Sequence, residues 1–186
     1  MDIGWPTHVF HTNIDDDNYV IEIYNWLMQK YSMQEQWPTN NTDIDVFKHP
    51  KHNTELYSKL ETFINSNVEQ YCQTVFKLDD DDCAKLQTKT HVSNHQNILG
   101  HQHSGSVVSG IFYIRAPEGA NLTLSDPRSN AVRGYPDPFK HYFNPKTIVP
   151  KDGDIVLFPS YLWHEVGSVA NSNRITMPFD TFYDYD

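Results

Sequence analysis

Hydrophobic positions divide the chain into a first part with helical spacing and a second part with strand spacing. After Asp17, the expected N-cap, apolar residues recur every three or four positions, as on one face of an amphipathic helix. The residues of this face are Val20, Ile23, Tyr24, Leu27, Met28 and Tyr31. A second face of this kind starts near Asn53 and comprises Leu56, Leu60, Phe63, Ile64, Val68, Tyr71 and Val75. We expect two helices that cover one face of a sheet.

After Lys85, short runs of β-branched and aromatic residues alternate with turn signals. The predicted strands are Thr88–His95, Val107–Arg115, Asn121–Leu124, Ile155–Pro159, Leu162–Val166 and Arg174–Phe182. The predicted turns are Ser104-Gly105, Pro117–Gly119 and Lys151–Asp154. Two helices followed by about seven short strands are typical of an α+β, mainly β, sandwich or barrel.

A long segment, Asp126–Pro150, interrupts the strands and is rich in Pro, Asn and Gly. Its aromatic part, Tyr135–Phe143, is a candidate lid that excludes water from a site, because loops of this length often have a function. At its start, Asp126 and Arg128 could orient a substrate or form a structural ion pair, and we favour the ion pair.

Size and composition predict one folded domain that spans residues 1–186. Hydrophobic residues make up 38% of the chain and aromatic residues 13%, which is enough for a core. The net charge of −10 argues against a nucleic-acid partner, which needs cationic side chains. The acidic clusters at 15–17 and 79–82 are interpreted as solvated loops or helix starts, because neither has the pattern of a calcium-binding loop.

The two cysteines, Cys72 and Cys83, have no metal or redox spacing, and we expect reduced thiols in a soluble, cytoplasmic protein. The start of the chain is polar and acidic, unlike a signal peptide, and no apolar run approaches the roughly 20 residues of a membrane span.

Three of the 10 histidines stand out by their context. His101 and His103 are two positions apart, and on a strand this spacing places both imidazoles on one face. Imidazole suits Fe, Zn, Ni and Cu, so the pair alone does not select the metal. The other histidines are interpreted as surface or packing residues, except that His91 and His95 remain ambiguous.

His164 ends a predicted pair of strands, and Arg174 follows ten residues later. Alternation places Arg174 and Thr176 on one face of the last strand, opposite a hydrophobic face. A cation within an apolar strand is costly unless it meets an anion, and a carboxylate ligand would satisfy it in a bidentate contact.

The spacing of these residues resembles that of the 2-oxoglutarate/Fe(II)-dependent oxygenase superfamily. The similarity is closest to small oxygenases of phages and marine bacteria. It lies in the blocks His101–His103, Ser109–Ile114, Leu122–Arg128 and Gly153–Arg174, and more weakly in Pro6–Phe10, so it covers most of the chain. The resemblance implies a double-stranded β-helix, that is, a jelly-roll, cupin-like core with the N-terminal helices packed on one sheet.

The resemblance also implies roles for individual residues. His101 and His164 would bind Fe(II), and His103 stands where most of the superfamily has a carboxylate. Three neutral histidines would leave the iron site with charge +2 instead of +1, and purified protein could then hold nickel or zinc. In a second register, His103-Ser104-Gly105 resembles carboxylate-free sites in which a halide fills the vacant position.

The same resemblance implies the binding site for the cosubstrate 2-oxoglutarate. Its distal carboxylate would contact Arg174, Thr176 and Tyr113, and Ser109 would line its pocket. O₂ and 2-oxoglutarate would together hydroxylate a substrate and release succinate and CO₂. A peptidyl proline or another protein side chain is the first candidate substrate, and a small metabolite or, less favoured, a nucleobase is also open.

Two other classes of protein stay open at this point. One is a non-catalytic, cupin-like module that binds a metal or sugar, although such a module has no need for Arg174. The other is a scaffold whose histidines are incidental. The oligomeric state leaves no signal in the sequence.

Overall fold

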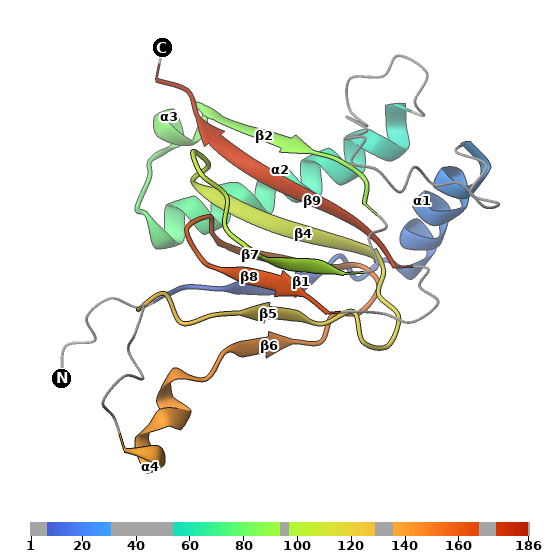
Figure 1. Ribbon diagram of the computed structural model, residues 1–186. Coiled ribbons are helices and arrows are strands. Elements are labelled where there is room, and N and C mark those ends of the chain that lie inside the picture. Colours follow the sequence, from blue (N-terminus) through green and yellow to red (C-terminus); the bar gives the residue numbers. More distant parts are fainter. Residues whose placement is uncertain (1–6, 31–53, 94–96, 129–135, 168–173, 186) are drawn as a thin grey trace.

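Two antiparallel β-sheets face each other in the protein, as seen in the computed structural model (Figure 1). The structure describes residues 7–30, 54–93, 97–128, 136–167 and 174–185. The five-stranded sheet has the order β1 (Phe10–Asn13), β7 (Asp154–Pro159), β4 (Val108–Arg115), β9 (Ile175–Tyr183) and β2 (Leu86–Thr90). The four-stranded sheet has the order β3 (Ile98–His101), β8 (His164–Val166), β5 (Leu122–Leu124) and β6 (Lys146–Ile148). This arrangement is the predicted double-stranded β-helix.

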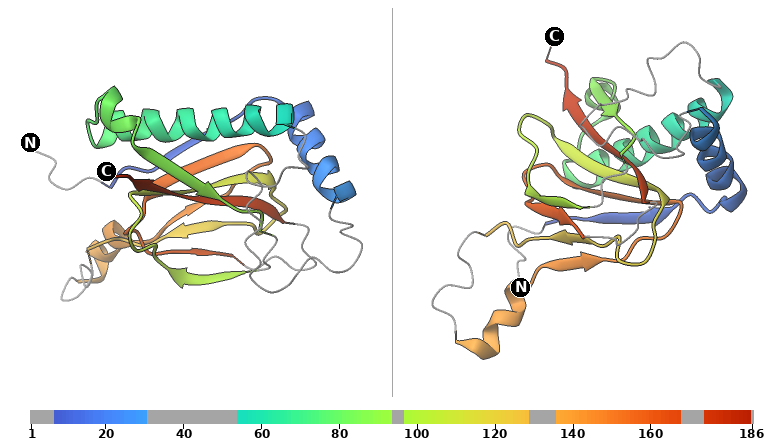
Figure 2. Two further views of the ribbon diagram at one scale, coloured as in Figure 1. Left: turned by 90° about the horizontal axis from the view of Figure 1, so that it is seen from above. Right: turned by 45° about the vertical axis from the view of Figure 1, so that its right-hand side comes forward.

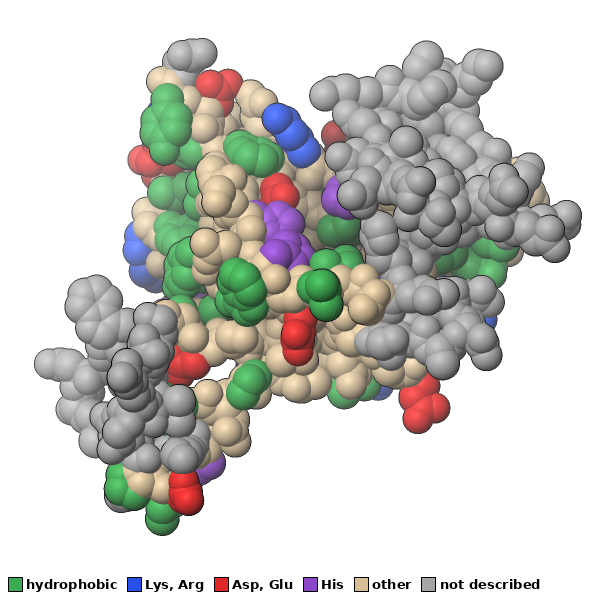
Figure 3. All heavy atoms as spheres, in the orientation of Figure 1, with side chains coloured by type: hydrophobic (Ala, Val, Ile, Leu, Met, Phe, Trp, Pro, Cys, Tyr) green, Lys and Arg blue, Asp and Glu red, His purple; other side chains and the backbone are tan. Residues whose placement is uncertain are grey.

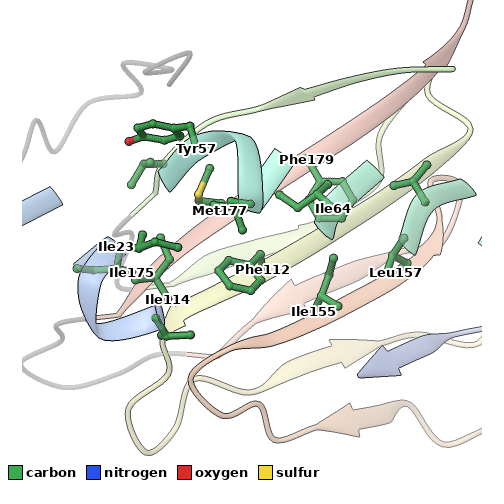
Figure 4. Packing of buried hydrophobic residues seen from close by; sticks show 14 of the residues in the cluster. Ile23, Tyr57, Ile64, Phe112, Ile114, Ile155, Leu157, Ile175, Met177 and Phe179 are labelled. Carbon is green, nitrogen blue, oxygen red and sulfur yellow. The ribbon is translucent and has the colours of Figure 1, made fainter. Parts of the chain in front are cut away.

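The two long helices lie on the outer face of the five-stranded sheet (Figure 2). They are α1 (Asp17–Lys30) and α2 (Thr54–Val75). Their apolar faces are buried against outward-facing strand residues such as Phe112, Met177 and Phe179 (Figure 4). The protein therefore has three layers: helices, the larger sheet and the smaller sheet.

Strand β4 separates two hydrophobic cores because its side chains alternate between the faces of the sheet. Phe112 and Ile114 pack under the helices, whereas Ile111 and Tyr113 belong to the core between the sheets. Gly110 also faces the helices, and a Cβ there would come within 2.3 Å of the Phe179 ring. One face of the larger sheet therefore packs against the helices, and its other face lines the space between the two sheets.

The sequence predicted both long helices and their buried faces, and the structure confirms them, except that Tyr31 lies outside the described residues. The cap of the first helix is one residue earlier than predicted, because Asp16 accepts a hydrogen bond from the main-chain N–H of Tyr19. The three predicted turns are confirmed by positive φ angles at Gly105, Gly119 and Gly153. The two acidic clusters lie at helix starts: the first includes the Asp16 cap, and in the second Asp79 caps the short helix α3 (Asp80–Cys83).

Three strands escaped the sequence analysis: β1, β3 and β6. Each has three or four residues, and such short runs carry little hydrophobic alternation. The other six strands were predicted, and most of their ends lie within about two residues of the predicted positions. The exception is β2, which ends at Thr90, well before the predicted His95. Residues 94–96, including His95, lie outside the described residues.

The candidate lid is only partly described, since Tyr135 lies outside the described residues. Helix α4 (Asp137–Lys140) and the 3-10 helix His141–Phe143 precede β6 in the chain and project from its start, away from both sheets (Figure 1). Before this segment, Arg128 forms the expected ion pair with Asp126. Among the described residues, no helix is long and apolar enough to cross a membrane.

Candidate metal centre and cosubstrate pocket

Three histidines converge at one end of the space between the sheets. His101 ends β3 and is paired in register with His164, which begins β8. One ring nitrogen from each of His101, His103 and His164 lies within 4.8 Å of the others. The predicted convergence of the two separated stretches is therefore present in the structure.

His103 reaches this point from a loop and not from a strand. The strand β3 ends at His101, so the expectation that both rings share a strand face is wrong in detail. The main-chain N–H of His103 donates to the carbonyl of Ser160, at 3.0 Å, and this bond holds the loop against the end of β7. The two rings meet because the chain turns there.

The hydrogen bonds of the three rings define which nitrogen faces the common point. Nδ1 of His101 lies 2.8 Å from the carbonyl of Leu99, and Nδ1 of His164 lies 2.9 Å from the carbonyl of Leu162. Nδ1 of His103 lies 2.7 Å from Oδ2 of Asp180. Carbonyl and carboxylate oxygens only accept, so each Nδ1 is assigned the proton, and in the neutral form of each ring the Nε2 lone pair faces inward.

These lone pairs make the site suitable for a cation. Nε2 of His101 lies 3.0 Å from Nε2 of His103, and two lone pairs at this distance repel each other unless a positive charge lies between them. Two nitrogens that each bind one ion at about 2.1 Å and at a right angle are separated by about 3.0 Å. The residues present therefore fit a bound metal ion.

His164 is the deepest of the three ligand candidates, with 3% of its surface exposed. Burial lowers its pKa to about 4. The ring is thus neutral at physiological pH, which is the form that binds metals.

The three histidines open into a pocket of about 390 Å³ between the two sheets. Its other walls include Ser93, Ile111, Phe158 and Val166, and Leu99 lies at the rim with 80% of its surface exposed. Histidine side chains gather near the centre of this face and are flanked by hydrophobic ones (Figure 3). None of the described residues of 136–143 lines the pocket, so a water-excluding role of that segment stays a prediction.

Arg174 and Tyr113 form a second buried polar group on the same side of the larger sheet. Arg174 is 1% exposed, and its Nη1 donates to the carbonyl of Gly167 at 3.0 Å. The Tyr113 hydroxyl is buried without a hydrogen-bond partner among the described residues. Burial raises the pKa of Tyr113, and the charge of Arg174 nearby partly offsets this rise. A buried guanidinium beside a buried hydroxyl without a partner fits an anionic ligand.

The hydrogen bond from Arg174 to Gly167 relates Arg174 to the position of His164. Strand β8 begins at His164, and Gly167 follows directly after its end. Three residues of extended chain, about 10 Å, therefore separate His164 from Gly167. A five-carbon dicarboxylate that is bound to an ion at His164 would extend across most of this distance. Neither Arg174 nor Tyr113 is among the described residues that line the pocket at the histidines, so their contact with 2-oxoglutarate stays a prediction.

Two predicted cosubstrate residues have protein partners here. Thr176 is opposite Tyr113 in the register, and its hydroxyl lies 3.4 Å from the carbonyl of Ser93. Ser109 lines the pocket, but its hydroxyl lies 2.5 Å from Oδ1 of Asp180. Their contact with a cosubstrate stays a prediction.

Asp180 is the residue of this site that the sequence analysis missed. It lies on β9 six positions after Arg174, so strict alternation from Arg174 already placed it on the inner face. Burial raises its pKa, but hydrogen bonds from His103 and Ser109 outweigh this effect and the pKa is lowered overall. The carboxylate is therefore ionised beside the histidine cluster.

A double-stranded β-helix with three convergent histidines and a buried arginine is the arrangement that the resemblance in sequence predicted for a non-haem iron oxygenase. Residues 89–180 match the model of the family described as "Putative 2OG-Fe(II) oxygenase". The chain belongs to the 2-oxoglutarate/Fe(II)-dependent oxygenases. It is an oxidoreductase whose metal is Fe(II) and whose cosubstrates are 2-oxoglutarate and O₂.

Solved structures share the fold at low sequence identity. A prolyl-4-hydroxylase from Pseudomonas putida has a TM-score of 0.62 and 14% identity, with 96% of this chain and 94% of that chain covered. AviO1 from Streptomyces viridochromogenes Tue57 has a TM-score of 0.60 and 9% identity, with 96% and 90% covered. The epimerase SnoN in complex with Fe3+, alpha ketoglutarate and nogalamycin RO has a TM-score of 0.56 and 10% identity, with 95% and 79% covered. No curated protein matches the sequence.

Proposed function

We propose that this oxygenase is a hydroxylase of a protein side chain, with His101, His103 and His164 as its three iron ligands. The observation that carries the proposal is the convergence of three inward-facing Nε2 atoms, each set by a hydrogen bond at Nδ1. It favours the register in which His101 is a ligand over the register that leaves a vacancy for a halide. Three protein ligands on one side of the ion leave the opposite positions for cosubstrates.

In this proposal the chain's own residues orient 2-oxoglutarate. Arg174 binds the distal carboxylate through its planar fork of donors, and the Tyr113 hydroxyl donates to the same group. The hydrophobic walls at Ile111, Phe158 and Val166 keep water from the reacting atoms. When bound, iron and 2-oxoglutarate supply the oxidising chemistry that inserts an oxygen atom into a C–H bond of the substrate.

The size of the pocket supports a side chain as the substrate. About 390 Å³ lies at the small end of ligand pockets, and 2-oxoglutarate would occupy part of it. The remaining room suits one side chain, such as that of proline, whereas the rest of a peptide would lie outside along the exposed rim at Leu99.

The test has two stages. Anaerobic addition of Fe(II) and 2-oxoglutarate should produce a weak visible charge-transfer band, and O₂ should then yield succinate. Absence of both results would favour a non-catalytic binding module. In the second stage, proline-containing peptides should gain one oxygen atom in mass and increase succinate formation. If only small metabolites are oxidised, the protein-substrate part of the proposal fails.

Tyr113→Phe provides a separate prediction for the cosubstrate pocket. The hydroxyl has no partner in the ligand-free protein, so its removal should leave the free energy of unfolding unchanged or raise it by about 1 kcal/mol. Loss of one hydrogen bond to a carboxylate should raise the KM for 2-oxoglutarate about tenfold. Urea unfolding and succinate assays measure the two effects. A strong loss of stability with an unchanged KM would assign the hydroxyl a structural role instead.

A further inference from the structure

The third histidine of the cluster has a partner that the other two lack. His101 and His164 direct Nδ1 at main-chain carbonyls, whereas His103 directs Nδ1 at the carboxylate of Asp180, at 2.7 Å. A hydrogen bond from imidazole to a carboxylate fixes the orientation of the ring and increases its basicity as a ligand. The position of His103 in the chain is also the one at which most of the superfamily has a charged ligand.

Asp180 is itself held in place by several donors. Its Oδ2 faces His103, and its Oδ1 accepts hydrogen bonds from Ser109 at 2.5 Å and from Ser106 at 3.3 Å. Ser109 is further held by Ser160, whose Oγ lies 2.9 Å away. This network links β4, β9 and the His103 loop, so the carboxylate has a defined position behind the metal-facing ring.

We propose that Asp180 acts through His103 as a positioning residue that supplies, from behind the ring, the negative charge that the three-histidine site lacks. The proposal rests on the proposed function, because it assumes that His103 binds the metal. The carboxylate of Asp180 then fixes the orientation of the His103 ring and increases the basicity of its metal-facing nitrogen, although Asp180 itself does not touch the ion. In the superfamily pattern the carboxylate is a direct ligand, whereas here it lies one ring further out.

The first test is metal affinity in the absence of turnover. Asp180→Asn keeps the shape of the side chain but removes its charge, and outer partners of this kind are typically worth 10–100-fold in metal affinity. We expect that loss for Co(II) and anaerobic Fe(II) by calorimetry, together with a changed visible spectrum of the Co(II) protein. Asp184→Asn is the matched control, because this substitution changes the net charge by the same amount. Asp184 directly follows β9 and accepts a hydrogen bond from the side chain of Gln87. The affinity of this variant should stay within about twofold of wild type, because Asp184 lies four residues further along the chain than Asp180, beyond the end of β9.

A second variant pair tests whether the negative charge can be moved between positions 180 and 103. His103→Asp alone should bind metal poorly, because two carboxylates would then face each other. Combined with Asp180→Asn, it should recover binding to within about tenfold of wild type, since the pair moves the carboxylate to the ligand position. A double variant that binds no better than His103→Asp alone contradicts the proposal.

The remaining outcomes separate this inference from the proposed function. Wild-type protein that binds no metal would overturn both. Wild-type protein that binds metal, with Asp180→Asn equal to it in affinity and spectrum, would overturn only the role of Asp180. Equal losses in the variants at positions 180 and 184 would also overturn it, because net charge would then be the cause.

Discussion

His164→Ala should remove stoichiometric Fe(II) binding and with it all succinate formation. The ring is the buried member of the cluster and lies opposite His101 in the register, and among the described residues the cluster has no fourth ligand candidate. Loss of a direct ligand should exceed the roughly 10–100-fold effect of an outer partner. Calorimetry with anaerobic Fe(II) and metal analysis of the purified protein measure the change.

Stability provides a second readout for the same variant. A ligand present at about 100 times its Kd stabilises the folded state by about 2.7 kcal/mol. Wild-type protein should therefore unfold at higher urea with Fe(II) than without, and the His164→Ala protein should show no such difference. His8→Ala is the control, because the His8 side chain is exposed. If His164→Ala still binds Fe(II) with wild-type affinity, the three-histidine site is wrong.

Arg174→Met should raise the KM for 2-oxoglutarate by about 100-fold or more. A guanidinium makes two charge-assisted hydrogen bonds to a carboxylate, each worth about 1.5–3 kcal/mol, and every 1.4 kcal/mol is a factor of ten. Arg174→Lys retains the charge but not the planar fork, so we expect an intermediate KM. Succinate formation at varied 2-oxoglutarate concentrations measures both variants.

Arg115→Met is the matched control for Arg174. Arg115 also lies at the junction of β4 and β9, but its Nη1 donates to the hydroxyl of Tyr24 on helix α1, on the other side of the sheet. Its replacement should lower stability and leave the KM for 2-oxoglutarate within about twofold of wild type. Equal KM values for wild type and Arg174→Met would place the dicarboxylate elsewhere. Urea unfolding of each variant separates weakened binding from loss of the fold.

Periodicity was sufficient to predict the two long helices and the long strands. Helix α2 presents apolar residues at regular intervals over 22 residues, and β4 and β9 combine β-branched and aromatic residues over eight and nine. Long segments accumulate enough alternation to exclude other structures. The short strands β1, β3 and β6 depend on neighbours that are distant in sequence, so no local pattern marks them.

At the site, too, the local sequence identified some features and the tertiary contacts decided the others. Residue types and spacing marked His101, His103, His164 and Arg174 as candidates, and the resemblance to a family implied their roles, which stay predictions. Which nitrogen each ring turns inward depends on carbonyls and on Asp180, whose positions follow from the packing of β9 against β4 and the His103 loop. Asp180 is 77 residues away from His103 in the chain. Only the folded sheet brings that carboxylate behind the ring, because a hydrogen bond requires two groups to be close in space and not in sequence.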